Sequence, residues 1–126
     1  MLDLTTIILT YNEELHIERC IRNVQQVCEK VYVVDSFSTD QTCEIAKECG
    51  AVVLQHKYVN QAQQFQWALE NCAITSEWTL RLDADEYLTE GLVAEIREKL
   101  TGLTAGVTGV NFTFRVKFLN HTLRFG

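Results

Sequence analysis

Polar and acidic residues gather at three places in the chain, each directly after a short apolar run. They are Thr10, Tyr11 and Glu13 after the first run, Asp35 and Ser36 after the second, and Asp83 and Asp85 after the fourth. In an open parallel sheet, ligands bind outside the carboxyl ends of the strands. If the apolar runs are neighbouring strands, these side chains converge on one crevice, and the convergence predicts a binding site.

Asp83 and Asp85 form the pair with the clearest chemistry. Side chains two residues apart in an extended chain point to the same side, so the two carboxylates can share a hard cation such as Mg²⁺ or Mn²⁺. Spacing alone leaves an alternative, in which they belong to a solvated turn and cap a helix that starts near Thr89. Their place at the end of a buried strand favours the metal site.

The turns after the first two apolar runs contain no glycine, because the first glycine of the chain is Gly50. This excludes a P-loop and a nicotinamide-binding fingerprint. A diphosphate in an acidic crevice therefore needs a cation that bridges it to Asp85. Tyr11 either stacks on a planar ring that Thr10 hydrogen-bonds, or packs as an ordinary loop residue.

Composition narrows the class of protein further. The chain has 126 residues, 47% of them apolar, and a net charge of -6, which is typical of one soluble globular domain and does not suit nucleic acid binding. The apolar runs are too short to span a membrane, so we expect a cytoplasmic protein, with peripheral contact at the inner face of the membrane left open. The five cysteines include no CxxC pair, and we expect reduced thiols. No histidine or serine has the partners of a hydrolytic triad.

Four apolar runs alternate with four segments of helical periodicity. Strands are predicted at 4–9, 31–34, 51–54 and 78–82. Helices are predicted after an Asn12 cap, between the capping box at 38–41 and Gly50, from Asn60 to Ala73, and after a Thr89 cap. This order predicts an α/β fold with a mainly parallel sheet covered on both faces. Alternation at Phe112, Phe114, Val116 and Phe118 predicts an antiparallel strand near the C-terminus. We expect residues 1–126 to form one domain that continues in a longer protein.

Three segments together resemble family 2 glycosyltransferases, closest to the bacterial subgroup that extends lipopolysaccharide core and other surface glycans. They are 7–14 (Ile-Ile-Leu-Thr-Tyr-Asn-Glu-Glu), 33–40 (Val-Val-Asp-Ser-Phe-Ser-Thr-Asp) and 82–86 (Leu-Asp-Ala-Asp-Glu). The resemblance covers nearly the whole chain. It implies a GT-A fold, a nucleotide-diphosphate sugar donor with a UDP-sugar favoured, a divalent cation, a glycan or lipid-glycan acceptor, and inversion at the anomeric carbon.

The resemblance also assigns roles to residues. Thr10, Tyr11 and Glu13 would line the nucleobase pocket, and Asp35 and Ser36 would lie nearby. Asp83 would meet the ribose and diphosphate, and Asp85, the last carboxylate of a DxD-like motif, would hold the Mn²⁺ or Mg²⁺. The catalytic base is expected beyond Gly126.

The sequence departs from the family pattern at two further positions. Many relatives carry a second acidic residue where this chain has Ser36, and an arginine thought to meet the diphosphate where it has Phe65. The missing arginine and base favour one alternative to a hexosyltransferase, a non-catalytic nucleotide-sugar-binding module. A sugar nucleotidyltransferase is a second alternative, ranked lower because residues 10–13 lack the glycine-rich, basic stretch that it requires.

Overall fold

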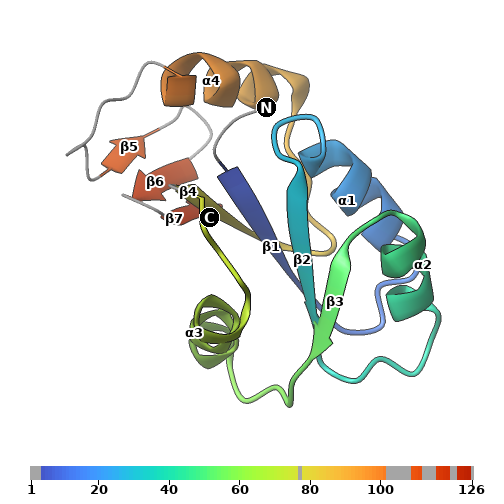
Figure 1. Ribbon diagram of the computed structural model, residues 1–126. Coiled ribbons are helices and arrows are strands. Elements are labelled where there is room, and N and C mark those ends of the chain that lie inside the picture. The colour runs from blue at the N-terminus through green and yellow to red at the C-terminus, as the bar shows by residue number, and fades with distance from the viewer. Residues whose placement is uncertain (1–3, 77, 102–108, 112–115, 120–121, 126) are drawn as a thin grey trace.

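The computed structural model describes residues 4–76, 78–101, 109–111, 116–119 and 122–125, which form strands and helices in alternation followed by a run of strands (Figure 1). The strands are β1 (Leu4–Thr10), β2 (Lys30–Asp35), β3 (Val52–Gln55), β4 (Trp78–Asp83), β5 (Gly109–Asn111), β6 (Val116–Leu119) and β7 (Thr122–Phe125). The helices are α1 (Ile17–Val24), α2 (Thr42–Glu48), α3 (Gln61–Asn71) and α4 (Glu90–Thr101).

The strands build one sheet in the order β3-β2-β1-β4-β7-β6-β5. Pairing is parallel from β3 to β7, and antiparallel for β7 with β6 and β6 with β5. The predicted α/β fold with a mainly parallel sheet is therefore confirmed. The predicted antiparallel strand is confirmed as β6, whereas residues 112–115 lie outside the described residues. The chain order reverses between β1 and β4, which makes the edge above them a topological switch point.

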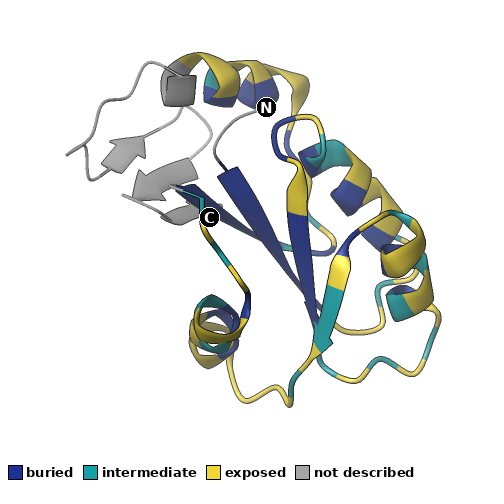
Figure 2. Cartoon of the chain, in the orientation of Figure 1, coloured by how far each residue is buried: buried dark blue, intermediate teal, exposed yellow. Residues whose placement is uncertain are grey.

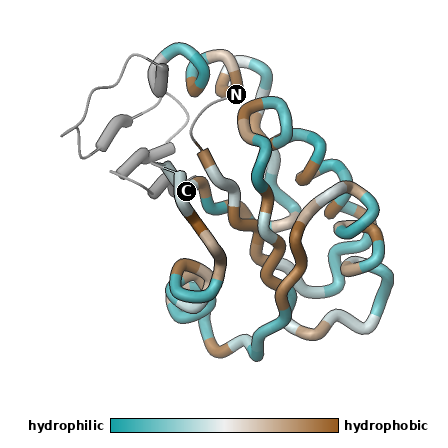
Figure 3. The backbone as a smooth tube through the Cα atoms, viewed as in Figure 1, coloured by the Kyte–Doolittle hydropathy of each residue, from teal (hydrophilic) through white to brown (hydrophobic). Residues whose placement is uncertain are grey.

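Helices cover both faces of the parallel part of the sheet, giving three layers (Figure 1). One core cluster joins α1, α2 and α4 to one face, and a second joins α3 to the other. Every residue of β1 is buried, and so is every residue of β2 after Lys30 (Figure 2). Figure 3 shows the same pattern by hydropathy: the central strands are mostly hydrophobic, and the outer turns of the helices are mostly hydrophilic. In the described part of the chain, no helix is long and apolar enough to cross a membrane.

Two predicted helix caps are wrong. Asn12 does not cap α1, which begins after His16 without a side-chain cap. The predicted capping box at 38–41 does not form either, because Ser38 and Gln41 make no side-chain hydrogen bond to α2. Within the same segment, Asp40 Oδ1 accepts from the Thr42 amide at 3.0 Å and so satisfies the first amide of the helix. The side chains of Asn12 and Ser38 instead join the loop after β1 to the loop after β2.

Three predicted helix ends are confirmed. The Asn60 side chain accepts a hydrogen bond from the Gln63 amide at 2.8 Å and caps α3, and the Thr89 hydroxyl accepts from the Leu92 amide at 3.2 Å at the start of α4. Gly50 follows α2 with φ at +92°, a conformation that glycine adopts without a steric cost. These caps are local, so the sequence alone reveals them.

Candidate functional site

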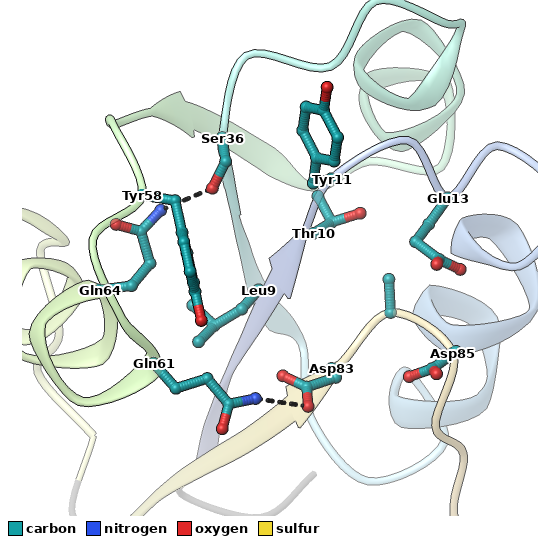
Figure 4. Close-up of a pocket in the computed structure, with 11 residues that line it drawn as sticks. Leu9, Thr10, Tyr11, Glu13, Ser36, Tyr58, Gln61, Gln64, Asp83 and Asp85 are labelled. Carbon is teal, nitrogen blue, oxygen red and sulfur yellow. Dashed lines mark hydrogen bonds between the residues drawn. The ribbon is translucent and has the colours of Figure 1, made fainter.

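A pocket of about 250 Å³ lies at the switch point between β1 and β4 (Figure 4). It is lined by Leu9, Thr10, Tyr11, Glu13, Ser36, Tyr58, Gln61, Gln64, Asp83, Ala84 and Asp85. The parallel register brings these residues together, because it pairs Leu9 of β1 with Asp83 of β4, and Thr10 with Asp35 of β2. Six of the seven residues predicted for the site line this pocket, and Asp35 is the exception.

Thr10 lines the pocket and has a hydroxyl without a hydrogen-bond partner. The residue is 6% exposed, and its Oγ1 is the one buried side-chain oxygen or nitrogen without a hydrogen-bond partner in the described part of the chain. A buried polar atom without a partner costs free energy, so native proteins rarely keep one. A ligand that contacts Thr10 would supply the missing partner.

Asp83 and Asp85 bring negative charge to the opposite wall. Asp83 lies half-buried at the end of β4, and its Oδ2 accepts a hydrogen bond from Gln61 Nε2 at 2.8 Å. Asp85 is exposed in the following turn, where its backbone oxygen accepts from the Arg19 guanidinium at 3.2 Å. Within the described residues, nothing hydrogen-bonds the Asp85 carboxylate, which leaves both of its oxygens for a ligand.

The electrostatics of this wall suit a cation. Partial burial raises the pKa of Asp83 above its usual value, and the Asp85 carboxylate adds to the rise while Arg81 and the Gln61 hydrogen bond oppose it. Burial also raises the pKa of Glu86, whose Oε1 accepts from the Asp83 amide at 2.8 Å. A bound cation would relieve this repulsion.

The carboxylates fit a hard divalent cation that a ligand helps to hold. Asp83 and Asp85 offer carboxylate oxygens, which Mg²⁺ and Mn²⁺ prefer. The described residues contain no group of three or more acidic, histidine or cysteine side chains placed to hold a metal alone. The donor set therefore fits a cation only if a ligand such as a diphosphate completes its coordination.

Asp35 lies beneath the site. It is fully buried, and its carboxylate accepts hydrogen bonds from the Ser38 amide at 2.7 Å, from the Ser38 hydroxyl, and from Gln55 Nε2 at 3.3 Å. The structure therefore places Asp35 as an anchor of the loop between β2 and α2. Its predicted contact with a nucleotide stays a prediction.

The loops after β1 and β2 are joined above Asp35. The Asn12 amide donates to Ser38 Oγ at 2.7 Å, and Asn12 Oδ1 accepts from the Thr39 amide at 2.8 Å. The Glu13 amide donates to Thr42 Oγ1 at 3.0 Å. These bonds hold the backbone on both sides of Asn12, which has φ at +50°. They position Tyr11 and Glu13 at the rim of the pocket (Figure 4).

Residues 5–124 match the model of glycosyl transferase family 2. The chain belongs to this family. The predicted family is thus confirmed, and the assignment sets the sugar nucleotidyltransferase alternative aside.

Two family 2 relatives are similar to this chain over most of its length. A glycosyltransferase of Rickettsia typhi is 40% identical over 96 residues, which are 76% of this chain and 32% of the relative. The lipopolysaccharide core biosynthesis glycosyltransferase LpsC of Rhizobium meliloti is 33% identical over 109 residues, which are 82% of this chain and 38% of the relative. The chain thus spans about a third of the length of these relatives.

Solved structures confirm the GT-A fold. The mannosyltransferase of Pyrobaculum calidifontis, in complex with GDP-Man and Mn²⁺, superposes with a TM-score of 0.71 at 24% identity, over 90% of this chain and 36% of that one. Other structures with this fold are complexes with UDP or with UDP-GlcNAc. At this level of identity the likeness shows the fold.

Three pocket residues escaped the sequence analysis of this family 2 domain: Tyr58, Gln61 and Gln64. Gln64 is 1% exposed, and its amide links His56 Nδ1 at 2.8 Å to Ser36 Oγ at 3.2 Å. Gln61 and Gln64 lie one turn apart at the start of α3, so they share a helix face. That spacing, together with the predicted start of α3 at a strand end, is the signal that could have found them.

Phe65, where the resemblance leads us to expect an arginine, packs into the core. It is 8% exposed and belongs to the apolar cluster between α3 and the sheet. The guanidinium carbon of Arg81 lies 5.6 Å from the centre of its ring. Phe65 therefore contributes to the core between α3 and the sheet. Arg81 of β4 supplies the positive charge near this wall of the pocket.

Proposed function

We propose that the chain is the donor-binding part of an inverting, metal-dependent hexosyltransferase. The donor is a nucleotide-diphosphate sugar, with a UDP-sugar favoured, and the acceptor is a glycan or lipid-linked glycan of the cell surface. One observation carries the proposal: Thr10, whose hydroxyl has no partner, lines the same pocket as Asp83 and Asp85. A nucleoside diphosphate offers a partner to both, since its base hydrogen-bonds and its phosphates take a cation.

The proposed roles follow from where each side chain lies. Thr10 hydrogen-bonds the base, Tyr11 and Tyr58 provide ring faces for stacking, and Asp83 meets the ribose and the diphosphate. Tyr11, Tyr58 and Ser36 line an adjoining, largely apolar space of about 330 Å³, which suits a planar ring. Asp85 holds the cation, because its carboxylate is exposed in the pocket and carries no other bond within the described residues.

The cation and the residues of the chain have different roles in the proposed reaction. When bound, Mn²⁺ or Mg²⁺ offsets the charge that develops on the departing diphosphate. The chain's own residues orient the donor so that the anomeric carbon stays open to the acceptor. A general base must remove the acceptor's proton for in-line attack, and we expect it in the part of the relatives' length that this chain does not span.

The pathway and the location are also part of the proposal. The identity to an enzyme named for lipopolysaccharide core biosynthesis supports a surface glycan as acceptor. All five cysteines are free thiols, which supports a reducing compartment such as the cytoplasm. We infer that the chain works there, at the inner face of the membrane where lipid-linked acceptors are found.

A non-catalytic nucleotide-sugar-binding module is the second candidate function. Phe65 favours it, because it packs where many relatives carry a cation for the diphosphate. Slow, metal-dependent hydrolysis of a UDP-sugar separates the two. An enzyme hydrolyses the donor above the rate of its Asp85→Ala variant, and a module does not.

Calorimetric titration tests the donor site. UDP, GDP and CDP are each titrated with and without manganese into the wild type and Asp85→Ala. We expect manganese-dependent binding of one nucleotide, which Asp85→Ala abolishes. Glu44→Ala, an exposed carboxylate on α2, is the matched control for charge loss. No binding by folded wild type would refute the proposed function.

A further inference from the structure

Arg81 is a buried cation beside the pocket. It is 8% exposed on β4, and its guanidinium donates a hydrogen bond to Gln61 Oε1 at 3.1 Å. Among the described residues it forms no ion pair, and its charge acts on Asp83 and Glu86 only through space. Burying a guanidinium without an ion pair costs free energy. An apolar residue would pack there at a lower cost, so the charge needs another explanation.

Gln61 connects Arg81 to the binding wall. Its Oε1 accepts from Arg81, and its Nε2 donates to Asp83 Oδ2 at 2.8 Å. Arg81 and Asp83 are two residues apart on β4 and lie on the same face of the sheet, toward α3. The three side chains therefore form a line from the buried cation to the pocket carboxylate.

The order of donors and acceptors along this line is determined by Arg81. A carboxamide has one accepting end and one donating end, whereas a guanidinium only donates. The oxygen of Gln61 must therefore face Arg81, which turns its NH₂ group toward Asp83. Without Arg81 the amide could rotate and place its oxygen against the carboxylate, where two acceptors repel.

We propose that Arg81 is a positioning residue, which acts through Gln61 to hold the Asp83 carboxylate in the orientation that receives the donor and its cation. The inference rests on the proposed function and deepens it. The bond from Gln61 occupies one oxygen of Asp83 and leaves the other toward the open centre of the pocket (Figure 4). Arg81 itself does not line the pocket, so its effect on a ligand passes through Gln61.

A double-mutant cycle tests this relay. UDP with manganese is titrated into the wild type, Arg81→Met, Gln61→Leu and the double variant. We expect each single variant to weaken binding about three- to tenfold, as for the loss of one hydrogen bond. The double variant should bind no more weakly than Gln61→Leu, because Arg81 has no route to the ligand once Gln61 is gone. The inference would be overturned if the two losses of affinity multiplied in the double variant, or if Arg81→Met bound UDP as tightly as wild type does.

Two further variants separate positioning from folding and from net charge. Arg81→Lys keeps a buried donor and should bind within about twofold of wild type, whereas a purely steric role would let Arg81→Met bind equally well. Arg22→Met removes an exposed positive charge on α1 and should bind as wild type does. If Arg81→Met does not fold, Arg81→Lys and Gln61→Leu still decide the matter, since a lysine variant as weak as Gln61→Leu contradicts the relay.

A ligand-free measurement keeps this inference distinguishable from the proposed function. The Gln61 side-chain amide is assigned in ¹H–¹⁵N spectra of the free chain by its absence in Gln61→Leu. Arg81→Met should shift these two proton signals, and Arg22→Met should leave them in place. If wild type binds no nucleotide, the proposed function fails, and these spectra alone decide whether Arg81 orients Gln61. Unmoved signals in Arg81→Met would overturn the relay.

Discussion

The buried carboxylate of Asp35 accepts hydrogen bonds from both the amide and the hydroxyl of Ser38, three residues further along the chain. The Ser38 hydroxyl oxygen in turn accepts from the Asn12 amide, so the loop after β2 supports the loop after β1. Asp35, which the sequence predicts at the ligand, thus stabilises the two loops that surround the pocket. Stability and binding are both expected to depend on it.

Asp35→Ala should lower the free energy of unfolding by about 2 to 3 kcal/mol, because the Ser38 amide loses its buried acceptor. Urea denaturation measures the change. Ser38→Ala keeps the hydrogen bond from the residue 38 backbone amide to Asp35, so it should lower the free energy of unfolding by only about 1 kcal/mol. Equal stability of Asp35→Ala and wild type would contradict the structural role.

Thr10→Val should weaken nucleotide binding without destabilising the fold. Valine has nearly the shape of threonine, and the Thr10 hydroxyl has no partner to lose within the described residues. The free energy of unfolding should therefore stay equal or rise by up to about 1 kcal/mol, while UDP affinity falls about fivefold. Thr42→Val is the matched control, since the Thr42 hydroxyl accepts from the Glu13 amide at 3.0 Å and its loss should destabilise. A destabilised Thr10→Val would show that its hydroxyl already has a partner.

Tyr58→Ala should reduce UDP affinity by about 1 to 2 kcal/mol, the cost of losing one stacking face. Tyr58 is 51% exposed, so the free energy of unfolding should change by less than about 0.5 kcal/mol. Tyr58→Phe keeps the ring and should bind as wild type does. Tyr87, an equally exposed tyrosine outside the pocket lining, provides the control variant Tyr87→Ala. Calorimetry that finds both alanine variants alike would rule out stacking on Tyr58.

Stability should decline in alkaline solution because of Cys20. Burial raises the pKa of this thiol to about 12, and the negative charge of Glu86 adds to the rise. In the unfolded chain the thiol ionises at about pH 8.5. Its stabilising contribution is therefore complete below that pH and is lost as the pH rises toward about 12, at up to about 1.4 kcal/mol per pH unit.

Urea denaturation at several alkaline pH values measures this slope. Cys20→Ala should flatten it, even though the variant starts from a lower stability after losing a core side chain. Cys49→Ala should change the slope less, because Cys49 is only partly buried. The same slope in Cys20→Ala and wild type would count against the raised pKa.

Much of the fold was predictable because its signals are local. The runs that became β1, β2 and β4 are rich in apolar residues and almost fully buried, as central strands covered on both faces are. Asn60 and Thr89 cap helices through bonds to amides three residues away. Such contacts are visible in any window of a few residues.

The wrong predictions concern side chains that had a local option and a distant one. Asn12 and Ser38 are both good helix caps by type, yet they bond to each other's loops across 26 residues of sequence. Once β1 and β2 lie side by side, this pairing satisfies backbone groups of two loops at once. Local propensity could not reveal it, because the competing partner is brought close only by the sheet.

The sequence by itself determined the family, the alternation of strands and helices, and the placement of Thr10, Asp83 and Asp85 at strand ends, because apolar periodicity and contiguous motifs need no knowledge of distant partners. Only the tertiary structure decided that β1 lies between β2 and β4, and that Asp35 lies beneath the site while Gln61 and Tyr58 enter it. Strand order and helix docking depend on contacts between residues far apart in the chain. Such contacts form only when the whole core is buried together.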